Sequence, residues 1–201
     1  MKITYGNILA MYFKASPADA GFDWYLTANN QIASLALDCK GQFSLQAIAA
    51  ITAALSPNNR WERNLIDCRA LINAFNTGGL ELASSIKCST YNNNKIKALK
   101  ILAGGDPLDV LGGLKVRAFY DNLLLGDSVT VDGHAYSIWA GEYIPTTKTP
   151  KISPKLYNQI VADYRLATEA VNNILNTNFK ARQIQSTTWL TLKRLVSDYA
   201  N

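Results

Sequence analysis

A carboxylate and the chain's only histidine lie two positions apart and could take part in the same chemistry. Asp132 and His134 follow the β-like run of residues 128–131 and open a helical stretch that extends to residue 140. An ionised carboxylate can stabilise positive charge in a transition state and can orient or deprotonate a nucleophile. Asp132 is therefore our candidate catalytic residue, although an aspartate here also commonly caps the following helix. For His134 we expect a hydrogen bond to a phosphate or to the backbone rather than proton transfer.

A turn built from two glycines lies upstream of this pair. Asp106 and Pro107 predict the start of a short helix, because aspartate is a good cap and proline fits the first helical turn. Gly112 and Gly113 break the pattern, and a second helix is expected over residues 114–125. Glycines allow positive φ and expose bare N–H groups, and such a turn before a helix attracts phosphate.

These features together resemble the helix-hairpin-helix DNA glycosylase superfamily, whose members include endonuclease III and 8-oxoguanine DNA glycosylases. Residues 111–116, Leu-Gly-Gly-Leu-Lys-Val, are similar to the family's hairpin, and residues 131–134, Val-Asp-Gly-His, to its Val-Asp-x-His motif. Upstream, residues 54–59 resemble the segment that supplies a wedge into the duplex. Residues 91–98 stand where the family has an aromatic residue leading into a basic helix. The hairpin departs from the family in having Gly112 where proline is usual and in being one residue short.

The resemblance implies an enzyme that flips a nucleotide out of double-stranded DNA and excises a damaged or modified base, as in base excision repair. Asp132 would act at the sugar. In members that also cut the strand, as AP lyases, a lysine at the start of the second hairpin helix attacks C1′. Lys115 has this place in one register of the hairpin and Arg117 in the other. We favour Lys115, because a guanidinium stays protonated and cannot form a Schiff base.

The same resemblance implies a set of DNA contacts. Asn58 and Asn59 would fill the gap left by the flipped nucleotide, or would instead cap the helix that begins at residue 60 or 61. The expected DNA-binding residues are Asn58, Asn59, Lys95, Gly112, Gly113, Leu114, Arg117 and His134. Two alternatives remain open, a non-catalytic DNA-binding protein and a base-modifying enzyme on the same scaffold. The sequence does not identify the base.

The composition agrees with a DNA partner and argues against a metalloprotein, an iron–sulfur protein and a membrane-spanning protein. The chain has 201 residues, 48% of them hydrophobic and 17% charged, with a formal net charge of +5. Its three cysteines are far apart, and none follows Cys88, so we expect no zinc site, no other metal, no iron–sulfur cluster and no cofactor. No apolar run approaches membrane-spanning length and no signal peptide is evident, so we expect a cytoplasmic monomer without a membrane partner.

The elements that must position these residues are helices. Apolar periodicity and turn residues predict helices over residues 3–14, 23–38, 44–55, 61–75, 80–86, 93–102, 107–111, 114–125, 135–140, 154–173 and 180–199, with a break at Gly41. The expected fold class is all-α, a two-lobed DNA glycosylase-like fold with a helix-hairpin-helix motif. One lobe would combine residues 1–56 and 126–201, and the other would hold residues 57–125.

Overall fold

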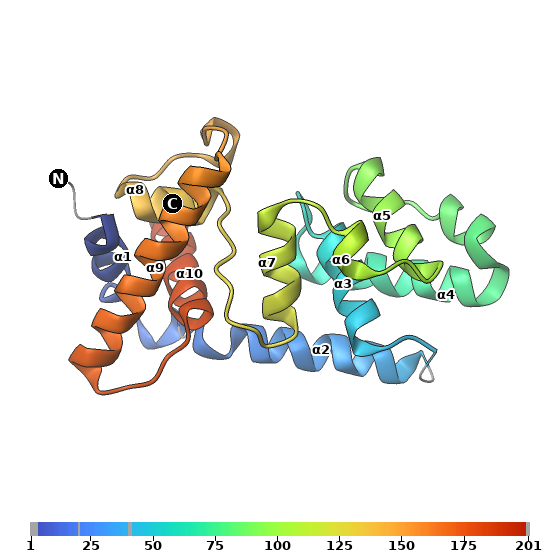
Figure 1. Cartoon of the computed structure of the whole chain (residues 1–201), viewed down its shortest axis with the longest axis horizontal. Coiled ribbons are helices and arrows are strands. Elements are labelled where there is room, and N and C mark those ends of the chain that lie inside the picture. The colour runs from blue at the N-terminus through green and yellow to red at the C-terminus, as the bar shows by residue number, and fades with distance from the viewer. Residues whose placement is uncertain (1–3, 20, 40–41, 200–201) are drawn as a thin grey trace. The chain divides into compact units, whose positions relative to one another are not determined.

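The computed structural model describes residues 4–19, 21–39 and 42–199, and the description below concerns these residues. They form helices without a single strand, so the predicted all-α class is confirmed (Figure 1). The α-helices are α1 (Thr4–Tyr12), α2 (Trp24–Asp38), α3 (Leu45–Leu55), α4 (Trp61–Ser85), α5 (Asn92–Leu102), α6 (Pro107–Val110), α7 (Leu114–Leu123), α8 (Gly133–Ala140), α9 (Pro154–Leu175) and α10 (Ala181–Tyr199). Short 3₁₀ turns are η1 (Pro17–Asp19), η2 (Gly21–Asp23) and η3 (Thr146–Lys148).

Local signals account for several helix starts. Ser44, Asp106 and Ser153 are the N-caps of α3, α6 and α9, and each side chain accepts a hydrogen bond from a backbone N–H in the first turn. The break expected between the helices over residues 61–75 and 80–86 is a kink inside α4, because Gly79 has a φ of 64° and the helix resumes beyond it. The break expected at Gly41 lies outside the described residues.

The chain divides into two compact units. Unit 1 contains residues 1–26 and 126–201, and unit 2 contains residues 27–125, so the division falls inside α2. The second boundary is where we expected it. The first differs from our expectation, since residues 27–56 belong to unit 2 rather than to the lobe of the terminal helices. The physical reason is α3, which packs on α4, α5, α6 and α7, all of them in unit 2.

The helix α3 is the core of unit 2. Its residues 48–55 are all buried, as the nearly all-apolar sequence predicts for a helix surrounded by others. Two polar groups inside it have partners. The hydroxyl of Thr52 donates to the carbonyl oxygen of Ile48 at 2.8 Å, and the side chain of Asn64 donates to that of Thr52 at 2.9 Å. Burial of the helix therefore leaves these groups hydrogen-bonded.

Unit 1 is built from α1, α8, α9 and α10, with η1 and η2 against α10. Its core includes Ile8, Ile160, Tyr164, Val171 and Ile184, all with no exposed surface. The apolar face of α9 predicted from helical spacing thus faces inward.

A buried ion pair joins η1 to α10 within unit 1. Asp19 is 3% exposed, and Nε of Arg194 lies 3.0 Å from its Oδ1 and 2.8 Å from its Oδ2. The backbone N–H of Ser16 donates to Oδ2 at 2.8 Å. Burial alone would raise the pKa of Asp19, but the hydrogen bonds from Ser16 and Arg194 and the charge of Arg194 outweigh it and lower the pKa below 3.8.

This pair gives unit 1 a pH-dependent stability. We expect Asp19→Asn to lower the free energy of unfolding by about 1–3 kcal/mol at about pH 7. A carboxyl whose folded pKa is depressed stabilises the fold fully above its ordinary value and loses that contribution as the pH falls through the folded pKa. The gap between the wild type and the variant, measured by urea unfolding, should therefore shrink below pH 3.8. Asp23→Asn, at an exposed position of η2, is the matched control with little effect. A gap that stays constant with pH would contradict this role.

Candidate active site

An extended segment of unit 1, residues 126–131, leads to Asp132 without joining a sheet. Val129 and Val131 are 1% and 2% exposed, so their backbone groups are away from water. One side chain serves both of them. The hydroxyl of Tyr157 donates to the carbonyl oxygen of Val129 at 2.8 Å and accepts from the N–H of Val131 at 3.3 Å. The β-like run is therefore held by α9 rather than by another strand.

The start of this segment is held by arginines of α9 and α10. Arg165 donates to the carbonyl oxygen of Asp127 at 3.1 Å, and the guanidinium of Arg182 donates to that of Gly126. The N–H of Arg182 also donates to the carboxylate of Asp127 at 3.3 Å. With both ends bonded, the segment places the residue that follows it in a defined position.

Asp132 is the N-cap of α8. Its Oδ1 accepts from the N–H of Ala135 at 2.9 Å, so the capping interpretation is confirmed. The residue is half-buried, and no described residue donates a hydrogen bond to Oδ2 or forms an ion pair with it. Burial raises the pKa of Tyr157 to about 12, and the nearby charge of Asp132 adds to this rise. The carboxylate thus has one anchored oxygen and one oxygen free for a ligand.

Aromatic rings lie beside this helix start. His134, in the first turn of α8, meets Trp189 of α10 edge to face, with ring centroids 6.2 Å apart. Trp24 meets the same indole at 6.0 Å, and Nζ of Lys193 lies 4.4 Å above its ring. We call Trp24, His134, Trp189 and Lys193 the Trp189 cluster. Nδ1 of His134 is buried and has no partner among the described residues, so the expected backbone hydrogen bond is not made at this atom.

Sequence reasoning missed Trp24 and Trp189. No local pattern connects them with Asp132, because they come from opposite ends of the chain and meet only in the folded unit. The aromatic residues of α8 itself, Tyr136 and Trp139, pack against the core of unit 1.

In unit 2, the turn between α6 and α7 has the conformation that its glycines predict. Gly113 is the N-cap of α7 with a φ of 82°, which favours glycine, and both Gly112 and Gly113 are exposed. No side chain caps α7, so its first N–H groups are available to a ligand. Leu114 begins the helix and is 44% exposed.

Lys115 and Arg117 differ in their partners. Lys115 is exposed in the first turn of α7, and no described residue pairs with its ammonium. Arg117 donates from Nε to the carbonyl oxygen of Leu111 at 2.7 Å and from Nη2 to that of Leu108 at 2.6 Å. The guanidinium of Arg117 therefore stabilises the C-terminal end of α6. These hydrogen bonds within the hairpin compete with the DNA contact that was expected of Arg117.

Lys95, which was expected to contact DNA, differs in its surroundings from Lys97 on the same helix, α5. Nζ of Lys95 donates to the carbonyl oxygen of Ser84, in the last turn of α4. Nζ of Lys97 lies 3.7 Å from where a Cβ on Gly112 would be. Lys97, rather than Lys95, places its charge at the glycine turn.

Asn58 and Asn59 do not cap α4. The N-cap is Arg60, which makes no side-chain capping bond, so the alternative interpretation of the asparagines as caps is wrong. Asn58 is exposed, has a φ of 58°, and donates to the hydroxyl of Tyr91 at 2.6 Å. Tyr91 is 64% exposed and precedes α5. Asn59 instead donates to the carboxylate of Asp67 at 3.0 Å.

Asp67 binds the loop before α4 to the loop before α5. It is 1% exposed, and its Oδ2 accepts from the side chain of Asn59 and, at 2.7 Å, from the backbone N–H of Ser89. Its Oδ1 accepts from Nε of Arg63 at 2.9 Å. Through these bonds the carboxylate of Asp67 holds the two loops together, and the exposed Asn58 and Tyr91 lie side by side on them.

The predicted residues thus lie in two groups. Unit 1 contains Asp132 and His134, and unit 2 contains the others: Asn58, Asn59, Lys95, Gly112, Gly113, Leu114, Lys115 and Arg117. In the described part of the chain, no three histidine, cysteine or acidic side chains gather as a metal site would require. Within the same residues, every helix is too short or too polar to cross a membrane.

Comparison with known proteins identifies a family over nearly the whole chain, since residues 2–195 match it. The chain belongs to the Family of unknown function (DUF7178). No curated protein and no solved structure matches it.

Loss of the Asp67 carboxylate should loosen both loops of unit 2. We expect Asp67→Ala to lower the free energy of unfolding by about 2–4 kcal/mol, because the side chain of Asn59 and the backbone N–H of Ser89 lose their shared buried acceptor. The measurement is urea unfolding followed by circular dichroism. Asp109→Ala, an exposed aspartate in α6, is the matched control and should cost less than about 1 kcal/mol. Equal effects of the two substitutions would show that Asp67 does not hold the loops.

Proposed function

We propose that this protein is a DNA N-glycosylase, which extrudes a damaged or modified nucleotide from a duplex and cleaves the bond between its base and its sugar. The observation that carries the proposal is the carboxylate of Asp132. Asp132 is half-buried, and its Oδ1 accepts a hydrogen bond from the N–H of Ala135. Its Oδ2 has no hydrogen-bond partner among the described residues.

The chemistry needs such a group. As the bond between C1′ and the base nitrogen breaks, its electron pair leaves with the base and positive charge develops on the sugar. A fixed carboxylate next to that centre stabilises the charge, and it can orient or deprotonate the nucleophile that adds to C1′. Anchoring of Oδ1 keeps the free oxygen in position, so little reorganisation is needed during the reaction.

The Trp189 cluster supports the proposal because it offers groups that could bind the extruded base. An extruded base is commonly held by stacking on aromatic side chains and by hydrogen bonds to its edges. Trp24 and Trp189 are half-buried rings beside the start of α8, and Nδ1 of His134 is a polar atom without a partner in the described residues. These are the groups that could receive a planar heterocycle in unit 1.

Surface features of unit 2 support binding to the duplex. The uncapped N-terminus of α7 offers N–H groups to a phosphate, with Lys97 beside the glycine turn. Asn58 and Tyr91 form an exposed, hydrogen-bonded pair. An amide and a phenol of this kind can fill the gap left by the extruded nucleotide and bond to the orphaned partner base. Arg117 and Lys95 contribute mainly to the fold, through their bonds to carbonyl oxygens.

Replacement of Asp132 by asparagine separates catalysis from capping, because asparagine caps helices as well as aspartate does. We expect Asp132→Asn to keep the unfolding free energy and the affinity for DNA, but to slow base excision by at least about 100-fold, as for loss of a charge that acts in the transition state. The assay incubates the protein with duplexes that each carry one lesion and resolves abasic products.

Asp106→Asn is the matched control, since Asp106 caps α6 with the same kind of bond, accepting from Leu108 N at 2.7 Å. It should leave excision unchanged. Excision that persists in Asp132→Asn would remove Asp132 from the mechanism. Wild-type protein that binds duplexes but releases no base from any of them would support the alternative of a non-catalytic DNA-binding protein.

The role of Lys115 is tested separately by borohydride trapping. If its amine attacks C1′ and displaces the base, the Schiff base that follows is reduced to a stable protein–DNA adduct. We expect an adduct with the wild type, none with Lys115→Ala, and normal yield with Lys100→Ala, which changes an exposed lysine of α5. An enzyme that excises bases without any adduct uses water instead, and Lys115 then has no covalent role.

A further inference from the structure

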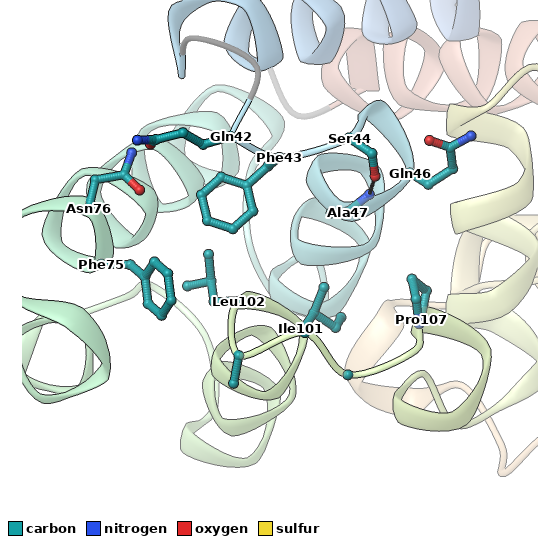
Figure 2. Close-up of a pocket in the computed structure, with 13 residues that line it drawn as sticks. Gln42, Phe43, Ser44, Gln46, Ala47, Phe75, Asn76, Ile101, Leu102 and Pro107 are labelled. Atoms are coloured by element: carbon teal, nitrogen blue, oxygen red, sulfur yellow. Dashed lines mark hydrogen bonds between the residues drawn. The ribbon is translucent and has the colours of Figure 1, made fainter.

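We propose that a cavity of unit 2, lined by none of the residues assigned above to the glycosylase site, binds a neutral nucleobase or nucleoside. The cavity has a volume of about 740 Å³, within the range of about 300–1,000 Å³ that is usual for small-molecule sites. It lies between the start of α3, the C-terminal end of α5 and the part of α4 before its kink, all within one unit. Figure 2 shows the side chains that line it.

The middle of the cavity is apolar and includes two aromatic rings. Phe43 and Phe75 meet edge to face with ring centroids 5.8 Å apart, and Figure 2 shows both rings turned toward the space. Ile101 and Leu102, which are 3% and 4% exposed, line it from α5. Such walls remove a flat, apolar ring face from water and can stack on it.

Carboxamides supply the polar groups. Figure 2 shows those of Gln42 and Asn76 at one end of the cavity and that of Gln46 at the other. Across the described residues, none of the three has a hydrogen-bond partner in the protein. The hydroxyl of Ser44, in contrast, already accepts from the N–H of Ala47 at 3.1 Å. A carboxamide presents a donor and an acceptor side by side, which is the pattern that pairs with the edge of a base.

The backbone at the end of α5 adds to this surface. Gly104 has a φ of 92°, and a Cβ on Gly105 would lie 2.8 Å from the carbonyl oxygen of Lys100. Both positions therefore require glycine, and they line the cavity with backbone atoms alone. Their N–H groups already donate to the carbonyl oxygens of Ile101 and Lys100, so the contribution of these glycines is room for a ligand to approach closely rather than hydrogen-bond donors.

The absence of charge narrows the ligand class. No acidic or basic side chain is among the described residues that line the cavity, so a phosphate or a carboxylate would find no counter-charge there. A purely apolar ligand would leave the three carboxamides unused. A flat heterocycle with both donors and acceptors, and without charge, uses the rings and the amides together. A nucleobase, free or as a nucleoside, is the biological ligand of this description.

Calorimetric titration of the full chain with adenosine, guanosine, cytidine and thymidine tests the proposal. We expect saturable binding of at least one nucleoside with a Kd below about 1 mM. The matching 5′-monophosphate should bind no more tightly, and toluene should bind more weakly. Asn76→Ala should weaken binding about fivefold by removing one amide, and Ala47→Phe should abolish it by filling the space. Asn73→Ala, an exposed asparagine of α4 outside the cavity, should have no effect.

Each other outcome overturns the proposal. These outcomes are no saturable binding of any nucleoside, equal binding of toluene, tighter binding of the monophosphate, or binding that both cavity variants retain. Trp189→Ala identifies the unit that binds, since loss of binding in that variant alone would assign the nucleoside to unit 1. If Ala47→Phe fails to fold, the comparison of Asn76→Ala with Asn73→Ala still decides. The titration measures nucleoside binding and not base excision, so a failure of nucleoside binding does not contradict the glycosylase proposal. In the same way, a failure of base excision does not contradict nucleoside binding in this cavity.

Discussion

A buried chain segment needs a partner for every polar backbone group, and in unit 1 this constraint is met by side chains. Residues 126–131 run extended through the unit without a ladder of hydrogen bonds. The hydroxyl of Tyr157 serves Val129 and Val131, and the arginines of α9 and α10 serve the start of the segment. An unpaired buried donor or acceptor would cost about 1–3 kcal/mol. These three side chains hold the segment at several points, and it ends at the residue on which the proposed function depends.

The cap and the catalyst proposed for Asp132 are compatible because a carboxylate has two oxygens. One oxygen satisfies an N–H in the first turn of α8. The other keeps its capacity to accept a hydrogen bond or to face a positive charge. Tyr157 remains protonated near neutral pH, since burial raises its pKa to about 12. The Tyr157 hydroxyl therefore continues to donate to the carbonyl oxygen of Val129 near neutral pH.

The sequence predicted the elements better than the contacts between them. Caps such as Asp106 and Ser153 are local signals, and the helices that they start were predicted within a few residues. The glycine turn was equally local, and Gly113 adopts the positive φ expected there. The role of Asn59 was not predictable, because its partner Asp67 lies in the next helix. Trp189 was missed for the same reason, since only the packing of α10 against α8 and η2 brings it to His134.

The net charge of the chain overstates what its surface can offer to DNA. Arg63, Arg69 and Arg194 are paired with carboxylates. Arg117, Arg165 and Arg182 donate to carbonyl oxygens, which leaves Arg60 as the exception among the described arginines. Guanidinium groups suit this work because their planar donors reach several acceptors and are weakly hydrated. Phosphate contacts would then fall to lysines such as Lys97 and Lys115 and to the N–H groups of α7. Recognition through backbone donors depends on the shape of the turn more than on total charge, so the DNA contact proposed for the hairpin does not require a high net charge.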